Sequence, residues 1–314
     1  MKKQRKILVT GGRGMVGKHL QEMLPKAVYV NSADCDLTSY SETNLLFLTH
    51  KPDVVIHLAA RVGGIIDNIN RPCDYFEDNI LMNTNMVNLS RLHGVDQFIG
   101  MLSTCIYPDL VHKYPMTEDM LHMGAPTKTN FSYGYAKRCL AVHIDACNEQ
   151  FGTKYQYLTP CNLYGEHDKW GKNSHFVAAL VKKIIIAHHN EEHTVKLFGT
   201  GEPLRQFMYA GDLAKVIKYV IDEDIRASFN VATSDNLPIS EIANIALGVF
   251  KKINPTSVAR FEYDPDKPNG QYRKDVSIKK LRRIIPEFEA TSLYVGLNKT
   301  FNSVLNEQIP IWLN

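Results

Sequence analysis

A tyrosine and a lysine stand four residues apart, at Tyr133 and Lys137, in a segment whose pattern favours a helix. This separation places both side chains on one helical face, about one turn apart. An ammonium group beside a phenol lowers the pKa of the phenol, so we expect Tyr133 to exchange a proton near neutral pH. The pattern is common by chance. It gains weight from Ser103, because this serine ends a predicted strand and ligands bind at such strand ends.

A cysteine follows this serine by two residues, at Cys105, in the stretch Ser-Thr-Cys-Ile-Tyr-Pro. The stretch contains no carboxylate that could serve as a base. A thiolate can remove a proton from the carbon next to a ketone, because such protons are acidic. The alternative is that Cys105 is a small buried hydrophobic residue, as most free cysteines are. Its position after Ser103 favours the thiolate base.

A histidine could supply the matching acid. His175 stands where Asn173 and Ser174 could begin a helix, and a histidine that enters a helix from a loop can act as a general acid. Cys105 and His175 would then form a base and an acid on opposite faces of one substrate. His167 lies close by in the sequence and is the rival acid.

Three glycines follow the first predicted strand, at Gly11, Gly14 and Gly17, and a helix is predicted after them. Such a loop allows a tight turn and close approach of the backbone to a pyrophosphate, whose oxygens the N–H groups of the helix face. The spacing G-x-x-G-x-x-G differs by one residue from the G-x-G-x-x-G pattern. The strand before the loop and the helix after it favour a dinucleotide site over an ordinary turn.

Residues near this loop indicate which dinucleotide binds. The end of the second predicted strand, residues 30–33, has no carboxylate to hold the ribose 2′-hydroxyl of NAD, and Arg13 in the loop would suit a 2′-phosphate. The sequence therefore favours NADPH, unless Arg13 is an ordinary solvated residue. Asp36 and Leu37 follow and would flank the adenine, although Asp36 could equally cap a helix.

The elements that must position these residues alternate regularly up to residue 164. Short apolar segments alternate with longer helical patterns, and residues 53–60 are almost wholly apolar, as in a parallel strand covered on both faces. This alternation predicts an α/β fold with a Rossmann-type, doubly wound parallel sheet. Strands are predicted at residues 6–10, 27–30, 53–60, 97–103 and 155–163, and helices at residues 16–24, 40–50, 74–93 and 135–151.

The rhythm loosens after residue 164, where turn-rich segments separate the patterns. We predict an NADP-binding domain at residues 1–164 and a smaller, mixed α/β substrate lobe at residues 165–314. Some later residues, at about 205–235, are expected to return to the first domain. In this part, helices are predicted at residues 174–189, 211–222 and 240–251, and a short strand at residues 229–232.

The composition excludes several classes of protein. The 36 Lys and Arg residues nearly balance the 33 Asp and Glu residues, which argues against a nucleic-acid-binding protein. The six cysteines form no Cys-x-x-Cys pair, so we expect no metal site and free thiols in a reducing compartment. No segment approaches the roughly 18 apolar residues of a membrane span, and the apolar run at residues 7–9 is too short for a signal peptide. We expect a soluble, cytoplasmic protein.

The glycine loop, the strand end at residues 57–60, Ser103, Tyr133 and Lys137 together make nearly the whole sequence similar to the extended short-chain dehydrogenase/reductases. The resemblance implies that Ser103 and Tyr133 polarise the C4 oxygen of a sugar, and that Lys137 also holds the nicotinamide ribose. Dehydratases of this family carry an acidic pair after the serine, which is absent here. The implied cofactor contacts are Gly11, Gly12, Arg13, Gly14, Met15, Val16, Gly17, Asp36, Leu37, Leu58, Ala59, Ala60, Lys137, Pro160, Asn162, Leu163 and His175.

A closer likeness is carried by Lys274 and by residues 60–65, 103–108, 133–137, 162–165, 174–175, 199–201, 205–207 and 267–270. In these stretches the sequence resembles the GDP-L-fucose synthase family. The resemblance implies NADPH-dependent conversion of GDP-4-keto-6-deoxy-D-mannose to GDP-L-fucose, by epimerisation at C3 and C5 and then reduction at C4. It assigns the base to Cys105, the acid to His175 and the proton donor of the reduction to Tyr133.

The resemblance also implies how the substrate is bound. The diphosphate would be met by Lys183, Arg205 and Lys274. Two further contacts depart from the family pattern: Phe198 stands where the family often has tryptophan before Gly-x-Gly, and Asn269 stands where it has aspartate. An aromatic face is kept at the first position, and a negative charge is lost at the second.

Other functions stay open at this stage. One is a reductase and epimerase of a related GDP-4-keto sugar, of the GDP-colitose or GDP-heptose type. Another is a 4-epimerase, which would retain tightly bound NAD, and a third is a non-catalytic NADPH-binding sensor. Retention of Ser103, Cys105, Tyr133, Lys137 and His175 together argues against the sensor. The family further implies a homodimer, in which the helices at residues 74–93 and 135–151 pair with their copies.

Overall fold

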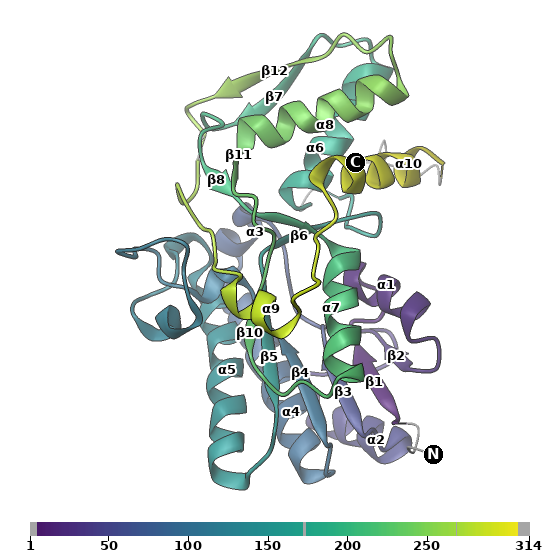
Figure 1. Ribbon diagram of the computed structural model, residues 1–314, viewed down its shortest axis with the longest axis vertical. Coiled ribbons are helices and arrows are strands. Elements are labelled where there is room, and N and C mark those ends of the chain that lie inside the picture. The colour runs from purple at the N-terminus through teal and green to yellow at the C-terminus, as the bar shows by residue number, and fades with distance from the viewer. Residues whose placement is uncertain (1–4, 172–173, 268, 307–314) are drawn as a thin grey trace.

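Six parallel strands form the main sheet, which occupies the lower half of Figure 1. The structure is a computed structural model that describes residues 5–171, 174–267 and 269–306. The third and fourth strands along the chain are buried at every position, as expected of apolar strands covered on both faces. The predicted doubly wound parallel sheet is confirmed. In spatial order the strands are β10 (Phe229–Val231), β5 (Gln156–Pro160), β4 (Gln97–Met101), β3 (Val54–His57), β1 (Ile7–Thr10) and β2 (Val28–Val30).

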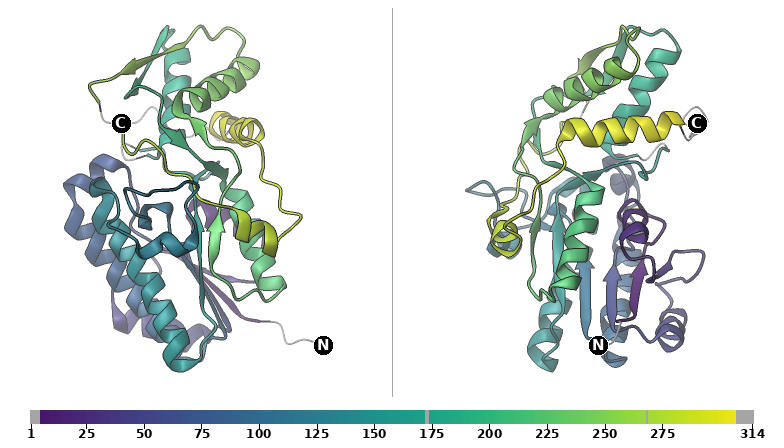
Figure 2. Two further views of the ribbon diagram at one scale, coloured as in Figure 1. Left: turned by 60° about the vertical axis from the view of Figure 1, so that its left-hand side comes forward. Right: turned by 45° about the vertical axis from the view of Figure 1, so that its right-hand side comes forward.

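Helices cover both faces of this sheet (Figures 1 and 2). On one face, α4 (Pro72–Leu92) packs side by side with α5 (Phe131–Phe151), and α2 (Tyr40–His50) lies beside α4. On the other face, α1 (Met15–Met23) packs against α7 (Ala210–Asp222). The helix that follows the glycine loop is therefore covered by a helix from much later in the chain.

Local sequence explains several helix ends. Ser39 caps α2 through its hydroxyl, which accepts a hydrogen bond from a backbone N–H of the first turn. Gly152 ends α5 at a φ of +66°, a left-handed conformation that glycine adopts without steric cost. The helix α5 begins at Phe131, four residues before its predicted start, so Tyr133 and Lys137 both lie on it.

The strand predicted at residues 155–163 is wrong in one respect, because it divides in two. The first part, β5, stays in the main sheet, whereas β6 (Asn162–Tyr164) pairs in parallel with β9 (Phe207–Tyr209) in a separate sheet of two strands. Pro160 ends β5, and proline has no N–H for the ladder. The apolar pattern runs through both parts, so periodicity does not reveal the change of partner.

A second hydrophobic core lies in the upper part of Figure 1 and belongs to the smaller lobe. Three helices enclose it: α6 (Phe176–His189), α8 (Ile239–Ile253) and α10 (Leu293–Asn306). The strands β7 (Thr194–Phe198) and β12 (Arg260–Asp264) pair in parallel at its edge. This lobe is mixed α/β, as predicted from the looser pattern after residue 164.

The chain passes between the two cores more than once. Both α7 and β10 lie late in the sequence, yet α7 packs on the main sheet's face and β10 pairs with β5. Next, α9 (Lys279–Ile284) packs against β10, and α10 returns to the upper lobe (Figure 2). The remaining elements are α3 (Ile65–Asn70), three 3-10 helices at η1 (Thr104–Ile106), η2 (Glu118–His122) and η3 (Lys128–Asn130), and the antiparallel strands β8 (Leu204–Arg205) and β11 (Leu237–Pro238).

Candidate active site

The parallel sheet gathers most of the predicted residues at one edge. The glycine loop follows β1, Ala59 and Ala60 follow β3, Ser103 follows β4, and Asn162 and Leu163 follow β5. Because neighbouring strands run parallel, their carboxyl ends meet at one edge of the sheet, where such folds bind ligands. The same edge holds the other predicted cofactor contacts on these strands, Leu58 and Pro160.

The glycine loop fits a pyrophosphate, because its positions leave no room for side chains. Gly11 has a φ of +73°, and a Cβ there would lie 2.9 Å from the backbone nitrogen of Ala59. A Cβ at Gly17 would lie 2.6 Å from the carbonyl oxygens of Gly11 and Gly12. Gly14 stands at the N-cap of α1. The first N–H groups of this helix are therefore available to an anion at the loop, such as the pyrophosphate of a dinucleotide.

The residues expected near the adenosine differ in their surroundings. Arg13 is exposed in the glycine loop, and Leu37 is buried. Asp36 does not cap α2, so that alternative is wrong: the cap is Ser39. Instead, the Asp36 carboxylate accepts hydrogen bonds from the hydroxyl and the backbone N–H of Thr38, at 2.7 and 2.9 Å, and these bonds lower its pKa.

A buried histidine joins the two strands beside the loop to the catalytic helix. His57 lies at the end of β3, with its Nδ1 2.8 Å from the Thr10 hydroxyl and its Nε2 3.1 Å from Oδ1 of Asn83. The amide of Asn83 in turn donates to the carbonyl of Ala136 on α5. Burial, together with the charge of Lys137, lowers the pKa of His57 to about 3, so the ring is neutral. Its role was missed from the sequence, although a histidine that ends an apolar strand was a visible signal.

Lys137 is held at the end of β4. Its side chain is buried, and its ammonium group donates to the carbonyl of Met101 at 2.9 Å. Burial lowers its pKa to about 8. The lysine is therefore fixed at the carboxyl end of β4, at Met101, which lies two residues before Ser103 in the sequence.

Tyr133 lies one turn before Lys137 on α5, but its acidity differs from our expectation. Burial raises the pKa of the phenol, the nearby charge of Cys105 raises it further, and only a hydrogen bond with Ser103 lowers it. The net shift is upward, so the prediction that the lysine lowers this pKa is wrong. The physical reason is that burial dominates and that the Lys137 ammonium is bonded to Met101. Tyr133 is thus a protonated phenol, suited to donate rather than to accept a proton.

The thiol of Cys105 is held by donors from three segments. The ammonium of Lys274 lies 3.1 Å from Sγ, and the amide nitrogen of Asn130 lies 2.8 Å from it. Burial acts to raise the pKa of the thiol, but the charge of Lys274 and hydrogen bonds from Ser103, Lys274 and Asn130 outweigh it and lower the pKa. The thiolate is favoured accordingly. Lys274, which is predicted to meet the diphosphate, contacts the base in this structure, and Asn130 was not found from the sequence.

His175 is paired with a carboxylate that the sequence reasoning left without a role. Its Nδ1 lies 3.2 Å from Oδ1 of Asp168, whose side chain is only 4% exposed. The hydrogen bond that His175 donates to Asp168 raises the pKa of His175, burial lowers it, and the charges of Asp168 and Cys105 raise it again, with a net upward shift. His175 stands at the N-cap of α6. Asn173, expected to help open this helix, lies outside the described residues.

The rival acid His167 lies in a different group of polar side chains. Its ring lies 5.3 Å from the ring of His19, on the buried side of α1. Next to it, the carboxylate of Glu166 accepts a hydrogen bond from the Tyr209 hydroxyl at 2.6 Å and lies 3.5 Å from Nε2 of His19. Burial acts to raise the pKa of Glu166, but the hydrogen bonds from His19 and Tyr209 lower it to about 2. The loop that carries His175 is therefore anchored to the helix that follows the glycine loop.

The predicted substrate residues fall into two groups. Arg205 lies near the base, since the charge of Cys105 acts on its guanidinium, although burial still lowers its pKa. Lys183 instead lies over the ring of Phe198, 5.2 Å from its centroid, and Phe198 is 59% exposed. Asn269 accepts a hydrogen bond from the backbone N–H of Thr200 at 2.7 Å, and so holds the Gly-Thr-Gly turn beside Phe198.

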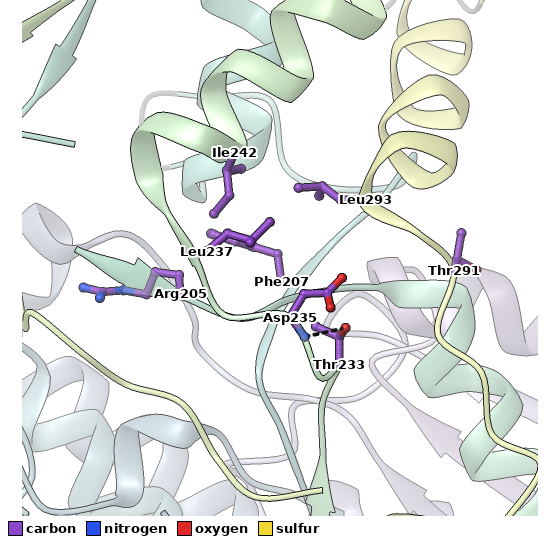
Figure 3. A pocket seen from close by; sticks show the side chains of 8 residues that line it. All are labelled: Arg205, Phe207, Thr233, Asp235, Leu237, Ile242, Thr291 and Leu293. Atoms are coloured by element: carbon purple, nitrogen blue, oxygen red, sulfur yellow. Dashed lines mark hydrogen bonds between the residues drawn. The ribbon is translucent and has the colours of Figure 1, made fainter. Parts of the chain in front are cut away.

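Two hollows adjoin this site. Figure 3 shows the first, where Phe207, Leu237 and Ile242 gather while the guanidinium of Arg205 points away from them. The second has a volume of about 380 Å³ and borders Tyr75, whose ring meets that of Tyr133 edge-on at 6.4 Å. A hollow of this size holds part of a small-molecule ligand. The second hollow is lined by Arg61, Val62, Asp67, Tyr75, Lys169, Gly171 and Ser174.

A metal site needs several ligating side chains close together, and a membrane span needs a long apolar helix. In the ranges that the structure describes, three or more His, Cys, Asp or Glu side chains nowhere gather closely enough to hold a metal ion. Within the same ranges, every helix is too short or too polar to cross a membrane.

The chain resembles proteins of known activity along nearly its whole length. The model of the NAD dependent epimerase/dehydratase family matches residues 7–232. A probable GDP-L-fucose synthase of Drosophila melanogaster is 34% identical over 310 residues, covering 94% of this chain and 95% of that protein. The GDP-L-fucose synthase of Dictyostelium discoideum is 34% identical over 308 residues, covering 95% and 94%. The crystal structure of a GDP-L-fucose synthetase from Naegleria fowleri bound to NADP has a TM-score of 0.88 at 30% identity, covering 99% of this chain and 95% of that one.

Proposed function

The chain belongs to the NAD dependent epimerase/dehydratase family, in the group of the GDP-L-fucose synthases, and from this premise we propose that it converts GDP-4-keto-6-deoxy-D-mannose to GDP-L-fucose with NADPH. One observation carries the proposal. The thiol of Cys105, bonded by Lys274, shares a site with the pair of His175 and Asp168. A simple reductase acts only on C4 and needs no base and acid directed at neighbouring carbons.

The first phase inverts two carbons. As a thiolate, Cys105 takes the proton from the carbon beside the C4 ketone, and the electron pair of the broken C–H bond forms an enolate. His175, whose pKa is raised by Asp168, acts as an imidazolium and gives a proton to the same carbon from the opposite face. Solvent then restores the thiolate and the imidazolium. Applied at C3 and at C5, these steps invert both centres.

The second phase reduces C4. NADPH supplies the hydride when it is bound. Tyr133 gives its proton to the C4 oxygen, and its raised pKa keeps the phenol protonated until then. Ser103 shares a hydrogen bond with Tyr133 and orients the same oxygen. Lys137, one turn along α5, holds the nicotinamide ribose.

The ligand contacts are proposed from the same placement. Phe198 would stack on the guanine base or a ribose, with Lys183 and Arg205 at the diphosphate. Asn269 would act through the turn that it holds, and Lys274 is assigned to the thiol. The proposed cofactor contacts are Gly11, Gly12, Arg13, Gly14, Met15, Val16, Gly17, Asp36, Leu37, Leu58, Ala59, Ala60, Lys137, Pro160, Asn162, Leu163 and His175.

The setting of the enzyme is part of the proposal. We place it in the cytoplasm, with residues 1–164 and about 205–235 for NADP and most of residues 165–314 for the GDP-sugar. We also propose a homodimer formed through α4 and α5. Apolar side chains exposed on these helices support that surface, and a monomeric mass by light scattering would overturn it. These exposed apolar side chains include Phe76 and Leu81 on α4 and Phe131 and Val142 on α5.

Isotope exchange tests the proposed activity. Wild-type enzyme incubated with GDP-4-keto-6-deoxy-D-mannose in deuterated water should place deuterium at C3 and C5, and NADPH should then yield GDP-L-fucose. Cys105→Ala should lose this exchange, whereas the matched control Cys139→Ala, an exposed cysteine on α5, should keep it. Exchange at the wild-type rate in Cys105→Ala would remove the role given to Cys105.

Product analysis separates the remaining alternatives. A panel of GDP-4-keto sugars identifies an enzyme of the GDP-colitose or GDP-heptose type by its preferred substrate. Tightly bound NAD in the purified protein would identify a 4-epimerase. Bound NADPH that no GDP-4-keto sugar oxidises would identify the sensor.

A further inference from the structure

Asn130 contacts the proposed base, Cys105, but has no role in the mechanism proposed above. It ends η3, directly before α5, and its amide nitrogen lies 2.8 Å from Sγ of Cys105. Lys274 donates to the same sulfur at 3.1 Å from the C-terminal part of the chain. A sulfur that receives two N–H donors is arranged as an acceptor, which is the role of a thiolate.

The other end of this amide has no partner within the described chain. Oδ1 of Asn130 is buried, and no hydrogen-bond donor of the described residues reaches it. A buried carbonyl oxygen without a donor is costly, and a bound ligand commonly supplies the missing donor. The nitrogen of the same amide is already occupied by Cys105. A hydroxyl that donates to Oδ1 would therefore lie next to the thiolate.

The surrounding bonds hold Asn130 in this position. The hydroxyl of Thr127, three residues earlier, lies 3.3 Å from Oε1 of Gln271, and the amide of Gln271 donates to the carbonyl of Asp109 at 2.7 Å. These bonds tie the turn before α5 to the segment that carries Lys274. A Cβ at Gly134 would lie 2.8 Å from the carbonyl oxygen of Cys105, so helix and base are closely packed.

Besides the neutral amide of Asn130, four titratable side chains interact with the thiol of Cys105. Lys274 lies beside the sulfur, and Arg205, His175 and Tyr133 each interact electrostatically with it. Asn130 differs from Lys274, Arg205 and His175 because its side chain is neutral at every pH. It can therefore orient the sulfur without adding a charge that would compete for the substrate.

We propose that Asn130 is a positioning and specificity residue of the epimerisation: its amide N–H orients the Cys105 thiolate, and its amide oxygen receives the C3 hydroxyl of the sugar. The assignment to C3 follows from the chemistry of the substrate, because C3 carries a hydroxyl and C5 carries only the methyl branch. The proposal rests on the proposed function, and it deepens the account of that same site.

The first experiment needs no substrate. Cys105 is alkylated with iodoacetamide over a range of pH, and its peptide is quantified by mass spectrometry in wild type, Asn130→Asp and the exposed-neighbour control Lys128→Ala. The isosteric aspartate keeps the shape but replaces the donor with a negative charge. The midpoint should shift upward by about one pH unit in Asn130→Asp and stay unchanged in Lys128→Ala. An unchanged midpoint in Asn130→Asp would overturn the orienting role.

The second experiment measures deuterium exchange at C3 and at C5 separately. In deuterated water, Asn130→Asp should slow exchange at both C3 and C5 by about tenfold or more relative to the reduction of an already epimerised 4-keto sugar. Asn130→Ala also removes the oxygen, so exchange at C3 should fall several-fold further than exchange at C5. Equal losses at the two carbons in Asn130→Ala would overturn the contact with the C3 hydroxyl.

The two experiments also separate this inference from the proposed function. If wild-type enzyme shows no exchange with any GDP-4-keto sugar, the proposed function fails and the hydroxyl contact fails with it. The alkylation profile still decides whether Asn130 orients the thiol. Folding of each variant is checked by its melting temperature, and Asn130→Asp remains informative if Asn130→Ala does not fold.

Discussion

Lys137 and Phe198 lie on two sides of the active site that the fold holds very differently. The lysine is 1% exposed, and its ammonium is bonded to a backbone carbonyl of the main sheet. The phenylalanine is 59% exposed on the smaller lobe, with Lys183 across its ring. The side that acts on C4 is therefore assembled before a ligand arrives. The side that faces the nucleotide leaves its contact surface open for a ligand to cover.

The acid and the base lie between these extremes. Cys105 is half-buried and bonded by Asn130 and Lys274, whereas the side chain of His175 is 40% exposed and relies on a single buried carboxylate. Strand ends of a buried sheet position side chains firmly, because the backbone on both sides is hydrogen-bonded. Loop residues depend on one or two side-chain bonds instead. Substitutions on the sheet side should thus damage catalysis most, and those on the lobe should mainly weaken binding.

The strongest test of this contrast is Tyr133→Phe. Loss of the proton donor should slow NADPH-dependent product formation by about 10³-fold. Deuterium exchange at C3 and C5 should fall far less, because Cys105 and His175 perform it. Formation of product is followed by NADPH absorbance and exchange by NMR, with Tyr135→Phe on the same helix as the control. Equal losses in the two assays would show that the two phases do not have separate donors.

Asp168→Asn should alter the pH dependence of exchange. The reaction needs a thiolate and an imidazolium, so its rate rises as pH passes the pKa of Cys105 and falls as pH passes the pKa of His175. Asp168 raises the pKa of His175, so its loss should move the alkaline fall to lower pH by about one unit. At pH values on the alkaline side of the profile, the exchange rate of Asp168→Asn should be about tenfold lower than that of wild type. An unmoved alkaline limb would contradict the pairing.

Gly17→Ala tests the cofactor cradle. The added methyl group would lie 2.6 Å from two carbonyl oxygens of the loop, so the loop must shift. We expect the Kd for NADPH to rise about tenfold, equivalent to about 1.4 kcal/mol. Fluorescence titration measures the Kd, and thermal melting reports the fold. The control is Gly248→Ala on α8, where a Cβ meets nothing within 4 Å and should leave the Kd unchanged.

The smallest effect is expected for Phe198→Ala. An exposed ring that stacks on the nucleotide should raise KM for the GDP-sugar about fivefold when it is lost. The kcat and the melting temperature should stay near their wild-type values, because the ring packs little within the protein. Steady-state kinetics measures both constants. A loss of kcat comparable to that of Tyr133→Phe would remove the difference between the two sides.

Much of this molecule could be predicted from short-range patterns. The glycine spacing, the strand and helix alternation, and the pair of Tyr133 and Lys137 all depend on residues within a few positions of one another. Such spacing sets backbone conformation and helical faces directly. The break between β5 and β6 escaped notice for the same reason, because one apolar pattern serves two different partners.

What determines the reactivity of the site comes from farther away. Lys274 reaches Cys105 across 169 residues of sequence, and Asn130 reaches it across 25. The expected direction of the Tyr133 pKa was wrong because burial, which no spacing encodes, dominates the shift. The sequence by itself determined which reactive groups exist and which strand ends and helix faces carry them. Only the tertiary structure decided which charges and donors meet them, because those depend on the path of the whole chain and on how completely it excludes water.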